Sequence, residues 1–99
     1  MPNAVTFASW KLKEGVSMPE FLHAAEKMHS EYASKVQGHI SQKLLVDGDV
    51  WAELIVWETM EDAQNAVNDE NNIYLQNYFS YIDVESITFH RHFFVEKSC

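Results

Sequence analysis

The chain has few of the residues that would place it in several large classes of protein. Its single cysteine, Cys99, ends the 99-residue sequence, so no internal disulfide can form and nothing indicates an oxidising compartment. No stretch approaches the roughly 20 apolar residues of a membrane span, and the N-terminus lacks the basic and apolar segments of a signal peptide. We therefore expect a cytoplasmic protein in which Cys99 is a tail residue.

Basic residues are also scarce. Seven lysines and arginines stand against fifteen aspartates and glutamates, which gives a formal charge of −8. Nucleic acids and anionic membranes both need clustered positive charge in the protein that binds them, so neither is an expected partner. The acidic excess is interpreted as a solvated surface that keeps the protein soluble.

Hydrophobic residues make up 46% of the chain and aromatic residues 13%, a composition typical of a folded protein. Because there is no repeat, low-complexity run or linker, residues 1–99 are expected to form one domain. The three tryptophans, six phenylalanines and four tyrosines are many for so small a core. Some of them are expected to serve an interface or a ligand pocket.

The residue pattern along the chain predicts the order β-α-β-β-α-β. Runs rich in β-branched and aromatic residues predict four strands: Ala4 to Leu12, His39 to Val46, Val50 to Trp57 and Ser86 to Val95. Apolar residues at helical spacing and polar caps predict the helical segments: one from Ser17 to Gln37, one from Thr59 to Val67 and one from Ile73 to Tyr81. Asn68 to Asn72 is a polar break, and Gly38 suits a left-handed helix end.

This order predicts an α+β ferredoxin-like domain. Right-handed crossovers give a four-stranded antiparallel sheet with the helices on one face. The strands, however, are apolar on both faces: in the third strand Trp51 and Ile55 point to one side, and Leu54 and Val56 to the other. Such an uncovered face is a larger apolar patch than a monomer tolerates. We therefore expect a homodimer in which a second copy covers it.

Two segments carry a resemblance to a known family. The strand end Ile55-Val56-Trp57 and the acidic cap Glu58 to Ala63 (Glu-Thr-Met-Glu-Asp-Ala) resemble the dimeric α/β-barrel superfamily. Within it, the chain resembles the antibiotic biosynthesis monooxygenase-like proteins over nearly its whole length. Ser80 to Ser86 most resembles members of uncharacterised function. The resemblance implies a homodimer whose sheets face each other as a barrel, with a ligand cavity between each sheet and its own helices.

The resemblance does not imply one reaction, because its members include cofactor-free oxidases of aromatic polyketides and quinones, haem-degrading enzymes and lactone isomerases. The asparagine, tryptophan and histidine that matter in haem-degrading relatives would fall near Ala8, Ala66 and Gln76. None of the three matches, which disfavours haem degradation. Trp57 matches the family's strand-end tryptophan, but the glutamate that many members carry two residues earlier is Ile55 here, and the acid is displaced to Glu53.

Two residues are candidates for acid–base catalysis. Glu53 lies mid-strand, where a buried carboxyl either pairs with a cation such as Arg91 or has a raised pKa. Unpaired, it is a general-base candidate. His29 lies at the margin of the apolar stripe of the first helix and can point into the sheet–helix cavity as an acid or base. A structural role is the competing interpretation for both residues.

Aromatic side chains are the predicted contacts for a planar apolar ligand. Those selected as substrate-binding are Trp10, Phe21, Trp57, Tyr78 and Phe79. The competing interpretation is that they fill the core or the dimer interface.

His90 and His92 form an H-x-H pair, which on a regular strand places both rings on one face and allows both to bind one metal ion. His39 could be a third ligand only if the fold brought it near, and a ferredoxin-like sheet separates its strand from the last one. We therefore predict no metal site and no cofactor, and interpret the pair as edge-strand histidines bonded to water or neighbours.

Together these features predict a homodimer that binds a small aromatic or polyketide-like molecule in the sheet–helix cavity. At most, it oxidises that molecule as a monooxygenase-like enzyme without metal or flavin. The alternative is a non-catalytic ligand-binding or stress-related accessory module. The first prediction requires an enclosed cavity of a few hundred Å3 with a polar group inside. The alternative predicts a filled core.

Overall fold

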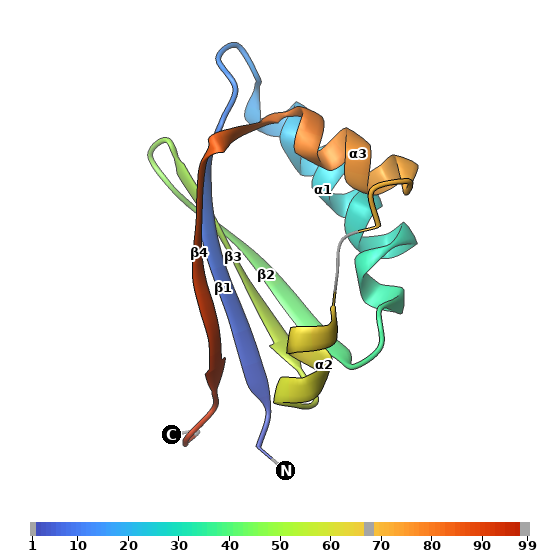
Figure 1. Ribbon diagram of the computed structural model, residues 1–99. Coiled ribbons are helices and arrows are strands. Elements are labelled where there is room, and N and C mark those ends of the chain that lie inside the picture. The colour runs from blue at the N-terminus through green and yellow to red at the C-terminus, as the bar shows by residue number, and fades with distance from the viewer. Residues whose placement is uncertain (1, 67–68, 98–99) are drawn as a thin grey trace.

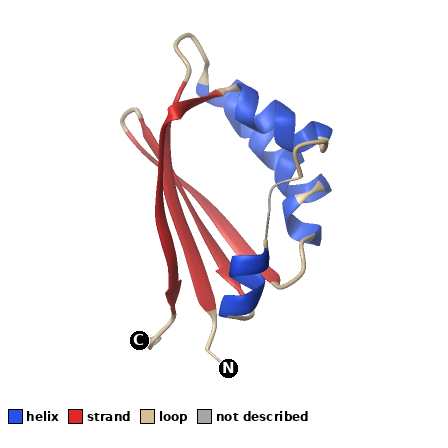
Figure 2. Ribbon diagram, in the orientation of Figure 1, coloured by secondary structure: helices blue, strands red, loops and turns tan. Residues whose placement is uncertain are grey.

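The computed structural model describes residues 2–66 and 69–97, which form one curved sheet with helices against one of its faces (Figure 1). The elements are β1 (Ala4–Leu12), α1 (Met18–Glu31), the 3-10 turn η1 (Ala33–Lys35), β2 (His39–Asp47), β3 (Val50–Trp57), α2 (Met60–Asn65), α3 (Ile73–Ser80) and β4 (Ile82–Phe94). Figure 2 shows all helices on the same side of the sheet. The predicted ferredoxin-like βαββαβ fold is therefore confirmed.

The sheet has the strand order β2-β3-β1-β4, with every neighbouring pair antiparallel. The first and third strands are thus central, and the second and fourth lie at the edges. Ala8 in the middle of β1 pairs with Glu53 on β3 and with Phe89 on β4. This register places the three side chains in one row on the helix-covered face.

The helices begin where the polar motifs predict. The Ser17 hydroxyl accepts a hydrogen bond from the Glu20 amide, and Glu20 reciprocates, which completes a capping box at the start of α1. The Thr59 hydroxyl caps α2 in the same way. Val67 and Asn68, where we predicted the end of a helix and the start of a break, lie outside the described residues. Within the described part of the chain, no helix combines the length and apolarity that crossing a membrane requires.

The first helix ends earlier than predicted. It stops at Glu31, and η1 replaces its expected last turn. Gly38 then adopts a φ of +83°, where a Cβ atom would overlap the side chain of Asp62. Only glycine meets both demands without strain.

The last strand differs most from the prediction. It begins at Ile82 rather than Ser86, and its pairing with β1 is interrupted by bulges. Arg91 has a φ of +88°, unusual for a non-glycine residue. The extra residue reverses the alternation: His92 pairs with Thr6 on the inner face, whereas the ring of His90 contacts Phe7 on the outer face. The prediction that both histidines share one face is therefore wrong.

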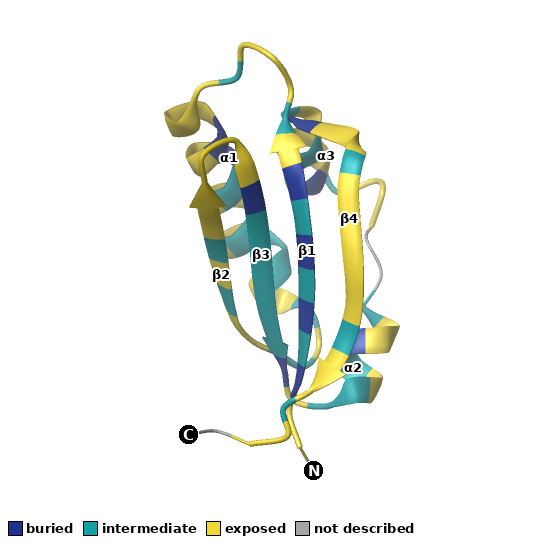
Figure 3. Cartoon of the chain, turned by 90° about the vertical axis from the view of Figure 1, so that its left-hand side faces the viewer, coloured by how far each residue is buried: buried dark blue, intermediate teal, exposed yellow. Residues whose placement is uncertain are grey.

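The outer face of the sheet is apolar and has no helix over it. Figure 3 views the sheet from this side, where β3 is of intermediate burial and β4 is largely exposed. Leu54 and Val56 are half-buried at its centre, and Leu45 and Phe93 are exposed at its two edges. The expectation of two apolar faces is thus confirmed.

Candidate functional site

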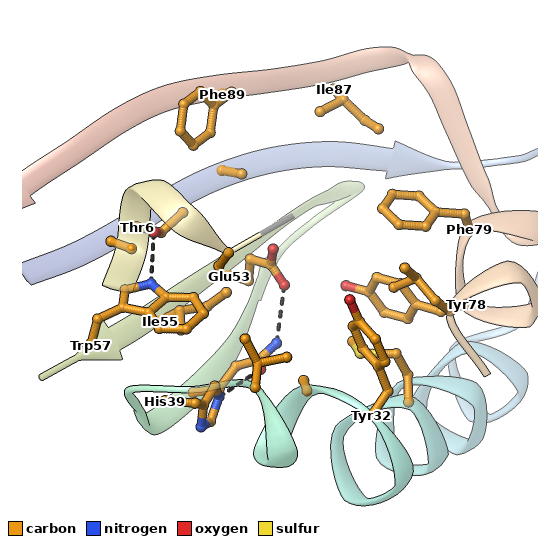
Figure 4. A pocket seen from close by; sticks show the side chains of 18 of the residues that line it. Thr6, Tyr32, His39, Glu53, Ile55, Trp57, Tyr78, Phe79, Ile87 and Phe89 are labelled. Atoms are coloured by element: carbon orange, nitrogen blue, oxygen red, sulfur yellow. Dashed lines mark hydrogen bonds between the residues drawn. The ribbon is translucent and has the colours of Figure 1, made fainter. Parts of the chain in front are cut away.

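A cavity of about 410 Å3 lies between the sheet and its helices. All four strands and the three α-helices contribute to its walls. The volume lies in the range that small-molecule sites occupy. Figure 4 shows the aromatic side chains and the polar groups of Glu53, Tyr32 and Tyr78 around it.

Small residues on the central strand create this space. The inward side chains of β1 are Ala4, Thr6 and Ala8 before Trp10 is reached, and all are buried. Trp10 belongs to one cluster of buried residues, and Trp57, which pairs with Ala4, belongs to another at the opposite end of the strand. The two tryptophans fill the ends of the layer, while an alanine and a threonine leave its middle open.

Glu53 points into the cavity from β3 (Figure 4). Its Oε2 accepts a 3.1 Å hydrogen bond from Nε2 of Gln42 on the neighbouring strand, and Oε1 of Gln42 lies 3.3 Å from Nε2 of His39. When the Glu53 carboxyl is ionised it only accepts hydrogen bonds, so the amide nitrogen of Gln42 faces Glu53 and the amide oxygen faces His39. His39 therefore donates from Nε2 and keeps the amide in this orientation.

Burial raises the pKa of Glu53 from 4.5 to about 7, and the Tyr78 hydroxyl and the Gln42 amide lower it only in part. Near neutral pH the carboxyl is thus present in both protonation states, as a group that takes and returns a proton requires. Burial and the adjacent Glu53 charge raise the pKa of Tyr78 above its ordinary value of 10, so its hydroxyl keeps its proton. Figure 4 shows this hydroxyl pointing toward Glu53.

Two buried polar atoms beside the cavity lack a well-formed hydrogen bond to any described residue. They are the indole nitrogen of Trp10 and the hydroxyl of Tyr78, which faces Glu53 without reaching full hydrogen-bond geometry. An unsatisfied buried donor costs about 1–3 kcal/mol. Such atoms are rare in folded proteins and call for a partner. An oxygen atom of a bound molecule would provide one.

A second polar chain crosses the other end of the cavity. The indole of Trp57 donates a 2.9 Å hydrogen bond to Oγ1 of Thr6, and the same oxygen lies 2.8 Å from Nδ1 of His92. The Thr6 side chain is itself buried. On the sheet side of the cavity, Glu53 on β3 and His92 on β4 thus lie on opposite sides of the small residues of β1.

The structure brings most of the predicted site residues together. Five of them line the cavity: Glu53, Trp10, Trp57, Tyr78 and Phe79. Phe21 is fully buried and has no surface toward it. Its ring packs at 4.9 Å from that of Trp51 and 5.2 Å from that of Tyr78, so it supports the cavity wall from behind.

The structure places His29 and Arg91 away from Glu53. His29 lines a second hollow of about 430 Å3 between α1 and β2, where its ring lies 5.4 Å from that of His39. It is not among the residues that line the cavity around Glu53, into which it was expected to point as an alternative acid–base group. Arg91 is exposed, with its guanidinium 5.8 Å from the centroid of the Phe93 ring. Among the described residues, the partners of Glu53 are Gln42 and Tyr78.

Sequence reasoning missed Thr6 and Gln42, and it considered His92 only as a possible metal ligand or an edge-strand histidine. Thr6 and Gln42 are polar residues at inward positions of apolar strands, and this was a readable signal. Their partners follow only from the strand register, which pairs Gln42 with Ile55, two residues from Glu53 on the same face, and Thr6 with His92. The inward direction of His92 depends on the bulge at Arg91, which no glycine or proline marks.

No protein-family model and no curated protein matches the sequence. Solved structures match it along its length. A variant of SnoaB, a cofactor-independent oxygenase from Streptomyces nogalater, has a TM-score of 0.73 at 10% identity and covers 99% of this chain and 97% of its own. A candidate antibiotic biosynthesis monooxygenase from Bordetella bronchiseptica has a TM-score of 0.68 at 14% identity, with 100% of both chains covered.

A dimeric ferredoxin-like protein of unknown function from Bacteroides fragilis has a TM-score of 0.61 at 14% identity and covers 93% of this chain and 95% of its own. At such identities the likeness establishes the fold alone. The chain has the ferredoxin-like fold of antibiotic biosynthesis monooxygenase-like structures, and the resemblance drawn from its sequence is confirmed at that level. The fold supports more than one activity.

Proposed function

We propose that this protein is a homodimer that binds a planar, largely apolar aromatic molecule in the sheet–helix cavity and acts on it as a monooxygenase-like enzyme. One observation carries the proposal: the cavity of about 410 Å3 contains the Glu53 carboxyl and adjoins the buried indole nitrogen of Trp10, which has no hydrogen-bond partner among the described residues. The likeness of the fold to a cofactor-independent oxygenase supports the class of reaction.

An aromatic ligand suits the walls of the cavity. Flat rings reach it from opposite sides: Trp57 from the sheet, Tyr78 and Phe79 from α3, and Phe89 from β4. Aromatic rings pack well against one another edge to face or offset. The small floor at Ala8 leaves room for a ring system lying across β1.

Glu53 would act first. Its carboxylate accepts a proton from a phenol, or from a methylene group between activating rings, and leaves a delocalised anion. The buried N–H of Trp10 and O–H of Tyr78 are donors for the oxygen on which that charge collects. With dioxygen as oxidant, a methylene becomes a carbonyl and the second oxygen atom leaves as water, so the substrate supplies all four electrons.

The second copy would cover the outer face of the sheet. Leu54 and Val56 form the centre of this face, and it continues into exposed Leu45 and Phe93. Covering such a continuous apolar surface is favourable, and a two-fold axis lets the same face serve both copies. The dimeric state of the similar Bacteroides fragilis protein supports this arrangement.

Filling the cavity tests the binding function. In the Ala8→Leu variant a larger side chain occupies the floor between Glu53 and Phe89, and Ala8→Ser keeps a small one as the matched control. A naphthol should raise the melting temperature of the wild type and of Ala8→Ser by mass action. It should not stabilise Ala8→Leu, whose own melting temperature should be unchanged or higher. Equal stabilisation of all three would refute binding in this cavity.

Turnover separates an enzyme from a binder. The assay is the rate of oxygen consumption with hydroxylated polycyclic aromatics, measured for the wild type and for Glu53→Gln. If Glu53 is the base, this rate should be at least a hundredfold lower in the variant. Binding without oxygen consumption in the wild type would favour the non-catalytic ligand-binding alternative.

A further inference from the structure

We infer that His92 is the hydrogen-bond donor through which the cavity selects ligands that carry an acceptor oxygen. The inference rests on the proposed ligand-binding function and adds to it a residue that determines specificity. His92 lines the same cavity as Glu53 but from β4, on the other side of the central strand.

The direction of two hydrogen bonds sets the tautomer of His92. The indole N–H of Trp57 can only donate, so Oγ1 of Thr6 accepts from it at 2.9 Å. The hydroxyl proton of Thr6 then needs an acceptor of its own. Nδ1 of His92, at 2.8 Å, is the acceptor that the described residues offer. The neutral ring therefore carries its proton on Nε2.

If Nδ1 carried the proton instead, Thr6 would accept twice and its hydroxyl proton would be left buried without a partner. The observed arrangement satisfies the indole N–H of Trp57 and the hydroxyl of Thr6, and it leaves the Nε2–H of His92 to be satisfied. Among the described residues no side chain accepts from that atom. The Nε2–H group of His92 can therefore donate a hydrogen bond to a bound molecule, and the ring does not act as a base toward it.

The ring of His92 is held in place. Thr6 fixes one edge, and the ring of Phe89 packs against it edge to face with centroids 5.1 Å apart. The side chain is half-buried on the inner face of the sheet. A donor that is oriented before binding loses little conformational entropy when a ligand arrives.

Glu53 and His92 place a proton acceptor and a hydrogen-bond donor on opposite sides of the cavity. Glu53 lies one strand to one side of β1 and His92 one strand to the other, and neighbouring strands are about 4.8 Å apart. Small Ala8 and Thr6 lie between them. A ligand that spans both therefore places an acidic hydrogen over β3 and a carbonyl or phenolic oxygen over β4.

Two probes of one shape test the selection. Acetylnaphthalene carries a carbonyl oxygen, and isopropenylnaphthalene replaces that oxygen by a CH2 group. Titrations followed by tryptophan fluorescence should show that the wild type binds the ketone about two- to tenfold more tightly, the range of one net hydrogen bond. His92→Leu should bind both equally, with the hydrocarbon affinity kept, and His92→Gln, which retains an N–H near the same place, should recover part of the preference.

His90→Leu is the matched control, because that ring lies two residues away on the outer face. It should keep the ketone preference. Long-range proton–nitrogen NMR supplies a readout that needs no ligand: His92 should show a protonated Nε2 and a bare Nδ1, and Thr6→Val should abolish this fixed tautomer.

The outcomes distinguish a failure of the inference about His92 from a failure of the proposed binding function. If both probes bind the wild type equally, if His92→Leu keeps the ketone preference, or if Nδ1 carries the proton, the inference is wrong and the binding function stands. If neither probe binds the wild type, the proposed function fails and the role of His92 fails with it.

Discussion

Replacing Glu53 by glutamine should make the stability of the protein respond differently to pH. In the folded chain the pKa of Glu53 is raised from 4.5 to about 7 by burial, so the folded state holds this proton more tightly than the unfolded state does. The resulting stabilisation is complete below pH 4.5, declines as the pH rises toward 7, and is absent above it. The shift corresponds to at most about 3 kcal/mol of unfolding free energy.

The Glu53→Gln variant is isosteric and cannot ionise, while its side chain can still accept the hydrogen bond that Gln42 donates. Near pH 4.5 the two proteins should have nearly equal unfolding free energies. By about pH 8 the variant should be more stable by as much as about 3 kcal/mol, because the wild type must bury a charge.

The assay is urea unfolding of both proteins at equal concentration over this pH range, with the difference in unfolding free energy plotted against pH. All other titrating groups are common to both chains and cancel in the difference. Glu58→Gln, which removes an exposed carboxyl just after the same strand, controls for the lost negative charge. A difference between wild type and Glu53→Gln that is constant with pH, or that favours the wild type at high pH, would refute a buried carboxyl with a raised pKa.

Two further predictions concern the dimer and the backbone. Leu54→Glu places a charge at the centre of the outer face, so light scattering should show the mass fall from that of a dimer to that of a monomer; a monomeric wild type would contradict the proposed interface. Gly38→Ala should lower the unfolding free energy by about 1–3 kcal/mol, because alanine is strained at a φ of +83° and its methyl group overlaps Asp62. Unchanged urea unfolding of this variant would show that the turn tolerates a side chain.

Much of the fold could be predicted from local signals. The strand Val50–Trp57 and the helix start at Ser17 were predicted at their observed positions. The alternation of apolar residues in a strand and the capping of a helix both depend on residues that are close together in the sequence. The end of α1 was not, since the apolar stripe continues through η1 although the hydrogen bonding changes. Pattern alone does not separate a helix from the 3-10 turn that follows it.

The candidate site could be predicted only in part. Glu53 stood out because a charged residue in the middle of an apolar strand needs a partner or a shifted pKa. Its actual partner, Gln42, comes from a strand register that the sequence does not specify. His92 escaped because one bulged residue reversed its direction, and His29 was misplaced because a residue at the margin of a helical stripe can face either of two hollows.

The proposed function depends most directly on whether an aromatic molecule enters the space between the sheet and its helices. Intermolecular NOEs between a bound naphthol and the methyl groups of the protein locate the ligand without any variant. We predict contacts to the methyls of Ala8, Ile55 and Ala63, which line the cavity. Contacts to Ala52 or Leu54 on the outer face instead, or no contacts at saturating naphthol, would contradict binding in this cavity.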